Sequence, residues 1–233
     1  MKLSVETMAI LSNFASINQN IHIEPGNYIK TKSPASSVIA IAKVPEEFPR
    51  AFSIYELSKL LNVFSLFEDP EIEFYDGHLD VSYKRAKASF AYTNTALVDA
   101  IKDYSKNIKE ADPAATFTID DVTFKRIQKS AKLFGIEDIN INSNGDNIVV
   151  NASDAPLSKA NANRYSIDIE PTETDYSNFS VNIKLDSLRF LPGDYEVSIA
   201  IVNVKNRSIA ICKFHNKSLS EADVTYIVSG DVD

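Results

Sequence analysis

The sequence has few of the features from which several classes of function are built. Cys212 is the only cysteine among 233 residues, which excludes a disulfide framework or a cysteine-based zinc site within one chain. No apolar run approaches the length that spans a bilayer. The opening segment, MKLSVETMAI, carries no secretory cleavage signature. We therefore expect a cytoplasmic protein with no membrane partner.

Catalytic motifs are also missing from the sequence. It holds no glycine-rich phosphate loop, no HExxH zinc motif and no GxSxG nucleophile motif. Its three histidines lie far apart in segments that read as strands or turns. A metal-dependent nuclease, the enzyme class left open, needs several converging carboxylates, and no motif arranges them. We expect no enzymatic activity, no metal site and no cofactor.

The composition is that of a folded, acidic protein. Hydrophobic residues make up 44% of the chain and charged residues 24%, which is enough to bury a core. The formal net charge is -8, from 24 Lys+Arg against 32 Asp+Glu. This balance argues against a protein that coats nucleic acid over its whole surface. It still permits one local basic face.

The chain reads as four copies of one unit, a helix followed by a hairpin, over residues 4–33, 54–84, 119–153 and 183–214. Apolar residues three and four apart predict the helices, and alternating residues predict the strands. The expected turns are Pro25-Gly26, Asp76-Gly77 and Asn144-Gly145. In the fourth unit Pro192-Gly193 stops the helix early.

Two units fit each half of the chain, which predicts an α+β protein with two domains, residues 1–110 and 111–233. The boundary falls in the polar stretch 93–116. Part of this connector, residues 96–112, reads as helical. The alternative is one irregular domain in which the hairpins resemble one another by chance.

One expected helix is basic on an otherwise acidic chain. The stretch FKRIQKSAKLFG, residues 124–135, is capped by Asp120, ends at Gly135 and contains no acid. At about 100° per residue its cations gather opposite its apolar residues. Lysine and arginine neutralise phosphates without reading sequence, so the stripe is either a nucleic-acid contact or a solvated face. The candidate DNA-facing residues are Lys125, Arg126, Lys129 and Lys132, with Lys59 on the second helix.

The ensemble of segments resembles the DNA polymerase sliding clamps, above all those of T-even-type phages. The likeness rests on the opening MKLS with AILSNFASIN, on KLFGIEDININSNGDNIVVN and on LPGDYEVSIA, and it covers nearly the whole chain in order. It implies a two-domain sliding-clamp fold and a processivity factor that closes as a homotrimeric ring around double-stranded DNA. It also implies, as partners in the host cytoplasm, the replicative DNA polymerase, an ATP-driven clamp loader and late-transcription factors.

In clamps of this kind the subunits join at sheet edges, where unpaired strands invite pairing. The resemblance therefore implies that Phe90 and Tyr92 of one copy lie near Tyr165 and Ile167 of the next. The short fourth helix and the helical connector depart from the family pattern and leave its partner pocket unassigned. The rival interpretation is a monomeric, non-catalytic module whose basic helix binds nucleic acid or an acidic partner.

Overall fold

The computed structural model describes residues 1–98, 112–143, 147–153, 163–169, 178–204 and 207–232. The chain divides into two compact units, Met1–Tyr104 with Leu219–Val224, and Ser105–Ser218 with Thr225–Asp233. Each combines helix with antiparallel sheet, so the expected α+β class is confirmed. The predicted boundary between residues 110 and 111, and most of the connector expected to be helical, lie outside the described residues.

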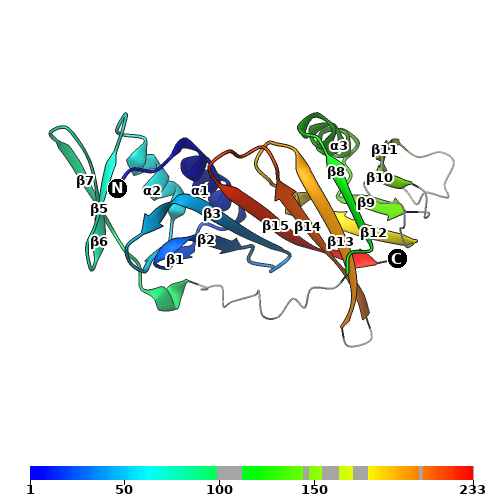
Figure 1. Cartoon of the computed structure of the whole chain (residues 1–233), viewed down its shortest axis with the longest axis horizontal. Helices are drawn as coiled ribbons and strands as arrows, with labels where there is room; N and C mark the ends of the chain where they lie inside the picture. The colour runs from blue at the N-terminus through cyan, green and yellow to red at the C-terminus, as the bar shows by residue number, and fades with distance from the viewer. Residues whose placement is uncertain (99–111, 144–146, 154–162, 170–177, 205–206, 233) are drawn as a thin grey trace. The chain divides into compact units, whose positions relative to one another are not determined.

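The first unit places two α-helices beside antiparallel strands (Figure 1). Its helices are α1 (Val5–Ile17), α2 (Leu57–Phe64) and the short 3-10 helix η1 (Thr95–Leu97). Its strands are β1 (Ile21–Ile23), β2 (Gly26–Lys32), β3 (Val38–Phe48), β4 (Phe52–Ile54), β5 (Glu71–Phe74), β6 (His78–Tyr83) and β7 (Ala86–Ala91). β1 pairs with β4, β2 pairs with β3, and β5, β6 and β7 form a three-stranded sheet.

The first expected hairpin is wrong in its pairing. The chain does change course at Pro25-Gly26, but β1 pairs with β4 rather than with β2. Ile21 and Ile23 of β1 are buried opposite Ile54 and Phe52. This apolar match lies far along the chain, so local turn chemistry does not reveal it. The Asp76-Gly77 turn, in contrast, joins β5 directly to β6 as predicted.

Among its described residues the second unit has one long helix, α3 (Asp121–Phe134), and supplies eight strands of an antiparallel sheet, against which the helix packs. The strands are β8 (Ala115–Ile119), β9 (Asp138–Ser143), β10 (Ile148–Ser153), β11 (Arg164–Ile169), β12 (Phe179–Lys184), β13 (Tyr195–Val204), β14 (Arg207–Asn216) and β15 (Asp223–Val232). They follow the order β11-β10-β9-β12-β15-β14-β13-β8, each antiparallel to its neighbours.

Two expectations for the second unit have different outcomes. The fourth helix is reduced to the single 3-10 turn η3 (Leu185–Ser187). Leu191 and Pro192 follow so soon that the chain has no room for an α-helix before β13. The expected turn at Asn144-Gly145 lies outside the described residues.

An aromatic cluster forms much of the core beneath the start of α3. The ring of Phe124 stacks on Phe190, with centroids 5.7 Å apart, and Phe190 stacks on Tyr226 at 4.3 Å. Tyr195 and Phe214 pack edge to face with each other at 6.4 Å, beside the same rings. Such ring pairs stabilise a core beyond the area that they bury. The cluster fixes α3 to β13, β14 and β15.

A single carboxylate in the first unit ties the start of the chain to a segment near its end. Glu6, in the first turn of α1, accepts hydrogen bonds from the backbone N–H of Ser220, Glu221 and Ala222, at 2.8 to 2.9 Å, and from the Ser220 hydroxyl at 2.8 Å. These donors, led by Ser220, lower the pKa of Glu6 from 4.5 to about 2, although desolvation opposes the shift.

The Glu6 contact predicts a specific acid response. A carboxylate whose pKa is lowered by folding stabilises the folded state fully above its unfolded pKa, near 4.5, and loses that contribution as the pH falls toward about 2. We expect Glu6→Gln to lower the free energy of unfolding at pH 7 by about 1 to 2 kcal/mol and to flatten its decline below pH 4.5. Glu47→Gln, at an exposed position of β3, is the matched control. Urea unfolding across pH 3 to 7 checks both, and parallel curves for Glu6→Gln and wild type would contradict the assignment.

Candidate nucleic-acid interface

The start and end of α3 are fixed by the residues that the sequence singled out. The Asp120 carboxylate accepts a hydrogen bond from the Thr123 N–H at 2.6 Å, and Gly135 ends the helix in the left-handed conformation, with φ of 67°. Asp121 accepts from the Gly193 N–H at 2.9 Å. Asp194 in turn accepts from the Asp121 N–H at 2.9 Å. This reciprocal contact anchors the first turn of α3 to the loop before β13.

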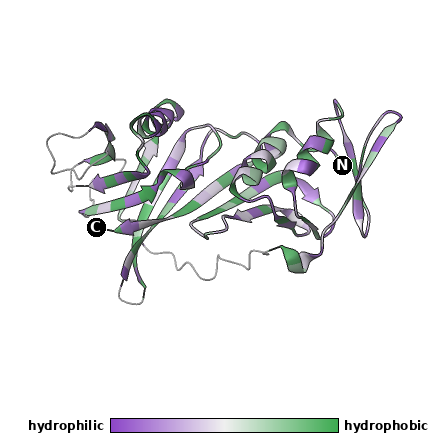
Figure 2. Cartoon of the chain, turned by 180° about the vertical axis from the view of Figure 1, so that it is seen from behind, coloured by the Kyte–Doolittle hydropathy of each residue, from purple (hydrophilic) through white to green (hydrophobic). Residues whose placement is uncertain are grey.

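The two sides of α3 differ completely in environment. Phe124, Ile127 and Ala131 are buried, and the helix lies against β10 and β11. The opposite side is exposed to solvent. Figure 2 shows that the helix carries both hydrophobic and hydrophilic residues. All four predicted cations of this helix lie on the exposed side: Lys125, Arg126, Lys129 and Lys132.

The cations are not equivalent. Lys125 forms an ion pair with Asp121 one turn earlier, and this hydrogen bond is the main reason why the pKa of Asp121 lies below its ordinary value. Arg126, Lys129 and Lys132 have no carboxylate of the described residues within ion-pair distance. We call these three residues the α3 basic face. They carry the uncompensated positive charge of the helix.

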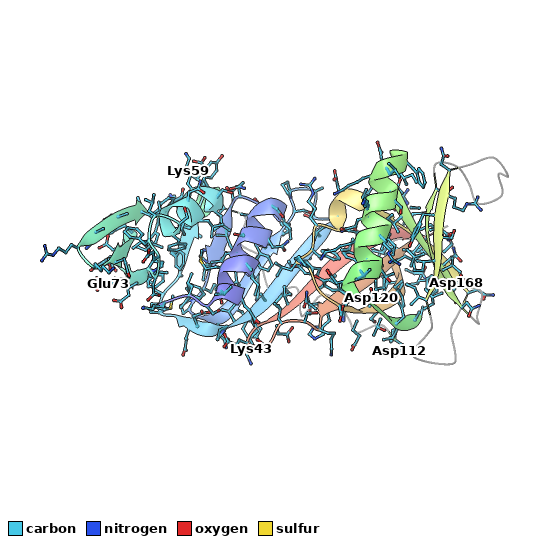
Figure 3. All side chains as sticks on the ribbon, turned by 90° about the horizontal axis from the view of Figure 1, so that it is seen from above. Lys43, Lys59, Glu73, Asp112, Asp120 and Asp168 are labelled. Atoms are coloured by element: carbon cyan, nitrogen blue, oxygen red, sulfur yellow. The ribbon has the colours of Figure 1, made fainter. Side chains whose placement is uncertain are left out.

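The other helices present little charge. Lys59, the candidate on α2, extends from the helix (Figure 3) and pairs with Glu56 three residues earlier. The exposed positions of α1 include the short polar side chains of Ser12 and Ser16. Thus the helices offer one strongly basic face and otherwise small or neutral side chains. A phosphate backbone requires no base-specific groups for contact.

The predicted subunit-contact residues lie on or next to strands at sheet edges. Phe90 lies on β7, and Tyr165 and Ile167 lie on β11, each half-buried. Tyr92 follows β7, and its ring stacks on Phe52 at 5.2 Å. Its hydroxyl is buried with no hydrogen-bond partner in the described part of the chain. The Tyr92 ring is therefore held within its own unit.

Three contacts of the acids around the helix starts were not predicted from the sequence. The Asp121–Lys125 pair had a readable signal, an acid four residues before a lysine on one helix. The Asp194 contact with α3 and the Glu6 contact with Ser220 had none, because each joins positions more than 70 residues apart. Asp121, Asp194 and Glu6 are thus all engaged in hydrogen bonds or ion pairs within the fold.

The described residues contain neither a metal cluster nor a membrane-spanning helix. No group of three or more His, Cys, Asp or Glu side chains there could hold a metal ion. No helix of those residues is long and apolar enough to cross a membrane.

Comparison with known proteins gives consistent matches in sequence. The family described as DNA polymerase processivity factor matches residues 4–110. A sliding clamp of Vibrio phage KVP40 is 26% identical over 200 residues, which cover 85% of this chain and 90% of the relative. A sliding clamp of Escherichia phage RB69 is 29% identical over 216 residues, with 85% and 87% covered. A sliding clamp of Enterobacteria phage T4 is 25% identical over 203 residues, with 84% and 86% covered.

Solved structures match over nearly the whole chain. The proliferating cellular nuclear antigen of Entamoeba histolytica gives a TM-score of 0.65 at 11% identity, covering 97% of this chain and 94% of that one. The A. fulgidus PCNA bound to the C-terminal region of FEN-1 gives 0.70 at 13% identity, covering 97% and 95%. The fold is that of a sliding clamp. The predicted resemblance to the T-even-type phage clamps is confirmed, and the matches support a processivity function. The family and the relatives are named for processivity and clamp functions and not for an enzymatic activity, which agrees with the prediction that the chain is no enzyme.

The unequal pairing of the α3 cations predicts unequal effects on stability. Lys125→Glu removes an ion pair and places two carboxylates one turn apart, so it should lower the free energy of unfolding by about 0.5 to 1 kcal/mol. Lys129→Glu should change it by less than about 0.5 kcal/mol, because that residue is exposed and unpaired within the described residues. Urea unfolding at low and high salt measures both. The difference between the two variants in free energy of unfolding should become smaller at high salt. Equal losses of unfolding free energy at low salt would show that Lys125 is not paired in solution.

Proposed function

We propose that three copies of this clamp close into a ring around duplex DNA and tether a replicative DNA polymerase. An ATP-driven clamp loader places the ring on DNA, late-transcription factors form a further class of partner, and the ring acts in the host cytoplasm. The observation that carries the proposal is the α3 basic face. An acidic chain with a sliding-clamp fold exposes three cations on one helix without a neutralising acid among the described residues.

The chemistry of this face suits a moving contact. Lysine and arginine attract phosphates at any sequence and release counterions when they bind. Their long side chains exchange one phosphate for the next without a fixed geometry. Three copies of the α3 basic face would line the inside of the ring. Lys125 and Lys59 would also lie there, but each is paired with an acid and would attract phosphates more weakly. The acidic remainder of the chain repels DNA, so the ring would stay on DNA by enclosing it.

The ring requires that copies join one another at sheet edges. We place this contact between β7 of one copy and β11 of the next, around Phe90, Tyr165 and Ile167, with Tyr92 beside it. Both strands are edges of their sheets within the described residues. Residues 1–110 and 111–233 then form the two halves of each subunit.

A monomeric binding module remains the second candidate, because the α3 basic face exists in a single chain. The two candidates differ in mass. The ring predicts a particle of three times the chain mass of 25.9 kDa at micromolar concentration. The module predicts one chain mass at every concentration. Sedimentation velocity over a dilution series decides between them.

The basic face is tested by reversing two of its charges. We expect Lys129→Glu with Lys132→Glu to leave the trimer folded but to reduce loading and polymerase stimulation, most at higher salt. Removing one lysine–phosphate interaction flattens the logarithmic salt dependence of binding by about 0.9. The control is Lys30→Glu with Lys43→Glu, which changes the net charge by the same amount. Lys30 and Lys43 follow buried Ile29 and Ala42 in β2 and β3, so their side chains lie on the outer side of these strands. Processive synthesis by the cognate polymerase is the readout, and equal effects of the two double variants would refute a DNA role for the α3 basic face.

A further inference from the structure

Two acids at helix starts have a cation as their only side-chain partner among the described residues. On α2, the Glu56 carboxylate lies 2.5 Å from the Lys59 ammonium group. In η3, the Asp186 carboxylate lies 3.0 Å from the Arg189 guanidinium. We call Glu56 and Asp186 the competing acids. On the basis of the ring proposed above, we propose that they compete with DNA phosphates for Lys59 and Arg189 and so limit how strongly the ring holds DNA.

Capping does not account for the acid at position 56. Glu56 is the N-cap residue of α2, yet its side chain accepts no capping hydrogen bond. Asp120, at the same position of α3, accepts one from the Thr123 N–H. Glutamate is also absent from the residues that N-cap positions favour, which are Ser, Thr, Asp, Asn and Gly. The carboxylate of Glu56 is instead turned to Lys59, three residues later.

Asp121 pairs with Lys125 in a different way. One of its oxygens accepts from the Gly193 N–H at 2.9 Å, while the other binds Lys125. Its side chain is only 30% exposed, against 47% for Glu56 and 89% for Asp186. Asp121 is therefore part of the anchor that holds the start of α3. The competing acids, in contrast, can release their cations without disturbing a backbone contact.

Arg189 lies close to the helix that carries the α3 basic face. The Gln128 side chain of α3 donates to the Leu188 carbonyl at 2.6 Å. The ring of Phe190 stacks on Phe124 of the same helix. Both neighbours of Arg189 in the chain are thus fixed to α3, and its own side chain is 54% exposed. Arg189 is therefore a further cation near α3 that a phosphate can bind in exchange for its acid.

The two exposed pairs weaken a phosphate contact in two ways. An acid within 3.0 Å of a cation cancels most of the field of that cation at greater distances. A phosphate that displaces the acid also leaves an unpaired carboxylate behind, which attracts a cation from solution. The net release of counterions, which drives the binding of cationic side chains to DNA, is then smaller. Exposed pairs contribute little to protein stability, so their removal should change DNA binding more than folding.

Removal of the competing acids tests the proposal. Glu56→Gln and Asp186→Asn keep the shape of each side chain and remove only its charge. The assembled protein is titrated onto a fluorescein-labelled linear duplex, onto which it can thread without a loader, and fluorescence anisotropy gives the binding constant. We expect tighter binding at low salt. Each cation that gains a phosphate should steepen the logarithmic salt dependence by about 0.9, an additional loss of affinity of about 3.5-fold between about 50 and 200 mM salt.

Two controls separate competition for a cation from a change in net charge. Glu47→Gln removes one negative charge from an exposed position of β3, and the salt dependence should stay that of the parent protein. In a chain that already carries Lys59→Gln, Glu56→Gln should no longer steepen the salt dependence, because no cation is left to release. Arg189→Gln should abolish the effect of Asp186→Asn in the same way. Urea unfolding checks that every variant is folded.

The charge reversal of the α3 basic face described above, run in the same titration, separates this proposal from the proposed function. If that reversal flattens the salt dependence while the two acid variants leave it unchanged, or act no differently from the β3 control, competition by the acids is overturned and the DNA contact of α3 stands. If neither set changes the salt dependence, the DNA role of the helices fails, and the competing acids fail with it. A steeper dependence that disappears when the paired cation is removed supports the proposal, and each acid is judged by its own cation.

Discussion

The stack of Phe124 on Phe190 determines which side of α3 faces outward. Phe190 is in turn held against Tyr226, and Phe124 also packs on Tyr195 and Phe214, so several ring contacts fix the helix to the sheet. Once Phe124, Ile127 and Ala131 are buried, the residues between them have to be exposed. The basic face therefore results from core packing and needs no contact among the cations themselves.

The contacts of the acids at the helix starts help to explain how a chain of net charge -8 exposes a basic surface. Acids at the helix starts are engaged by backbone N–H groups: Glu6 by the segment at Ser220, Asp120 by Thr123 and Asp121 by Gly193. These contacts satisfy helix dipoles and caps, where negative charge is favourable. These carboxylates therefore lie at the starts of α1 and α3, while the charged residues in the middle and at the C-terminal end of α3 are all positive.

Short sequence signals were sufficient to predict the features that depend only on neighbouring residues. The Asp120 cap, the Gly135 stop and the Asp76-Gly77 hairpin depend on residues within a few positions of one another, and all three were predicted. Prediction failed for β1, whose partner β4 lies about 30 residues further on. The fourth helix was expected to be short because Pro192-Gly193 stops it, and it is a single 3-10 turn. The four candidate cations of α3 are exposed, as the helical periodicity predicted. The pairing of Lys125 with Asp121 was missed, although their spacing of four residues is a readable signal.

Enclosure of DNA by the ring, with the α3 basic face only guiding the duplex, is the feature on which the proposed function depends. The most direct measurement is retention on DNA of different topology after loading by the cognate loader and ATP. We expect the protein to co-elute in gel filtration at moderate salt with a nicked circular plasmid and to be released when the plasmid is cut once. Equal retention on the circle and on the linear product would contradict enclosure, because binding would then depend on surface affinity alone.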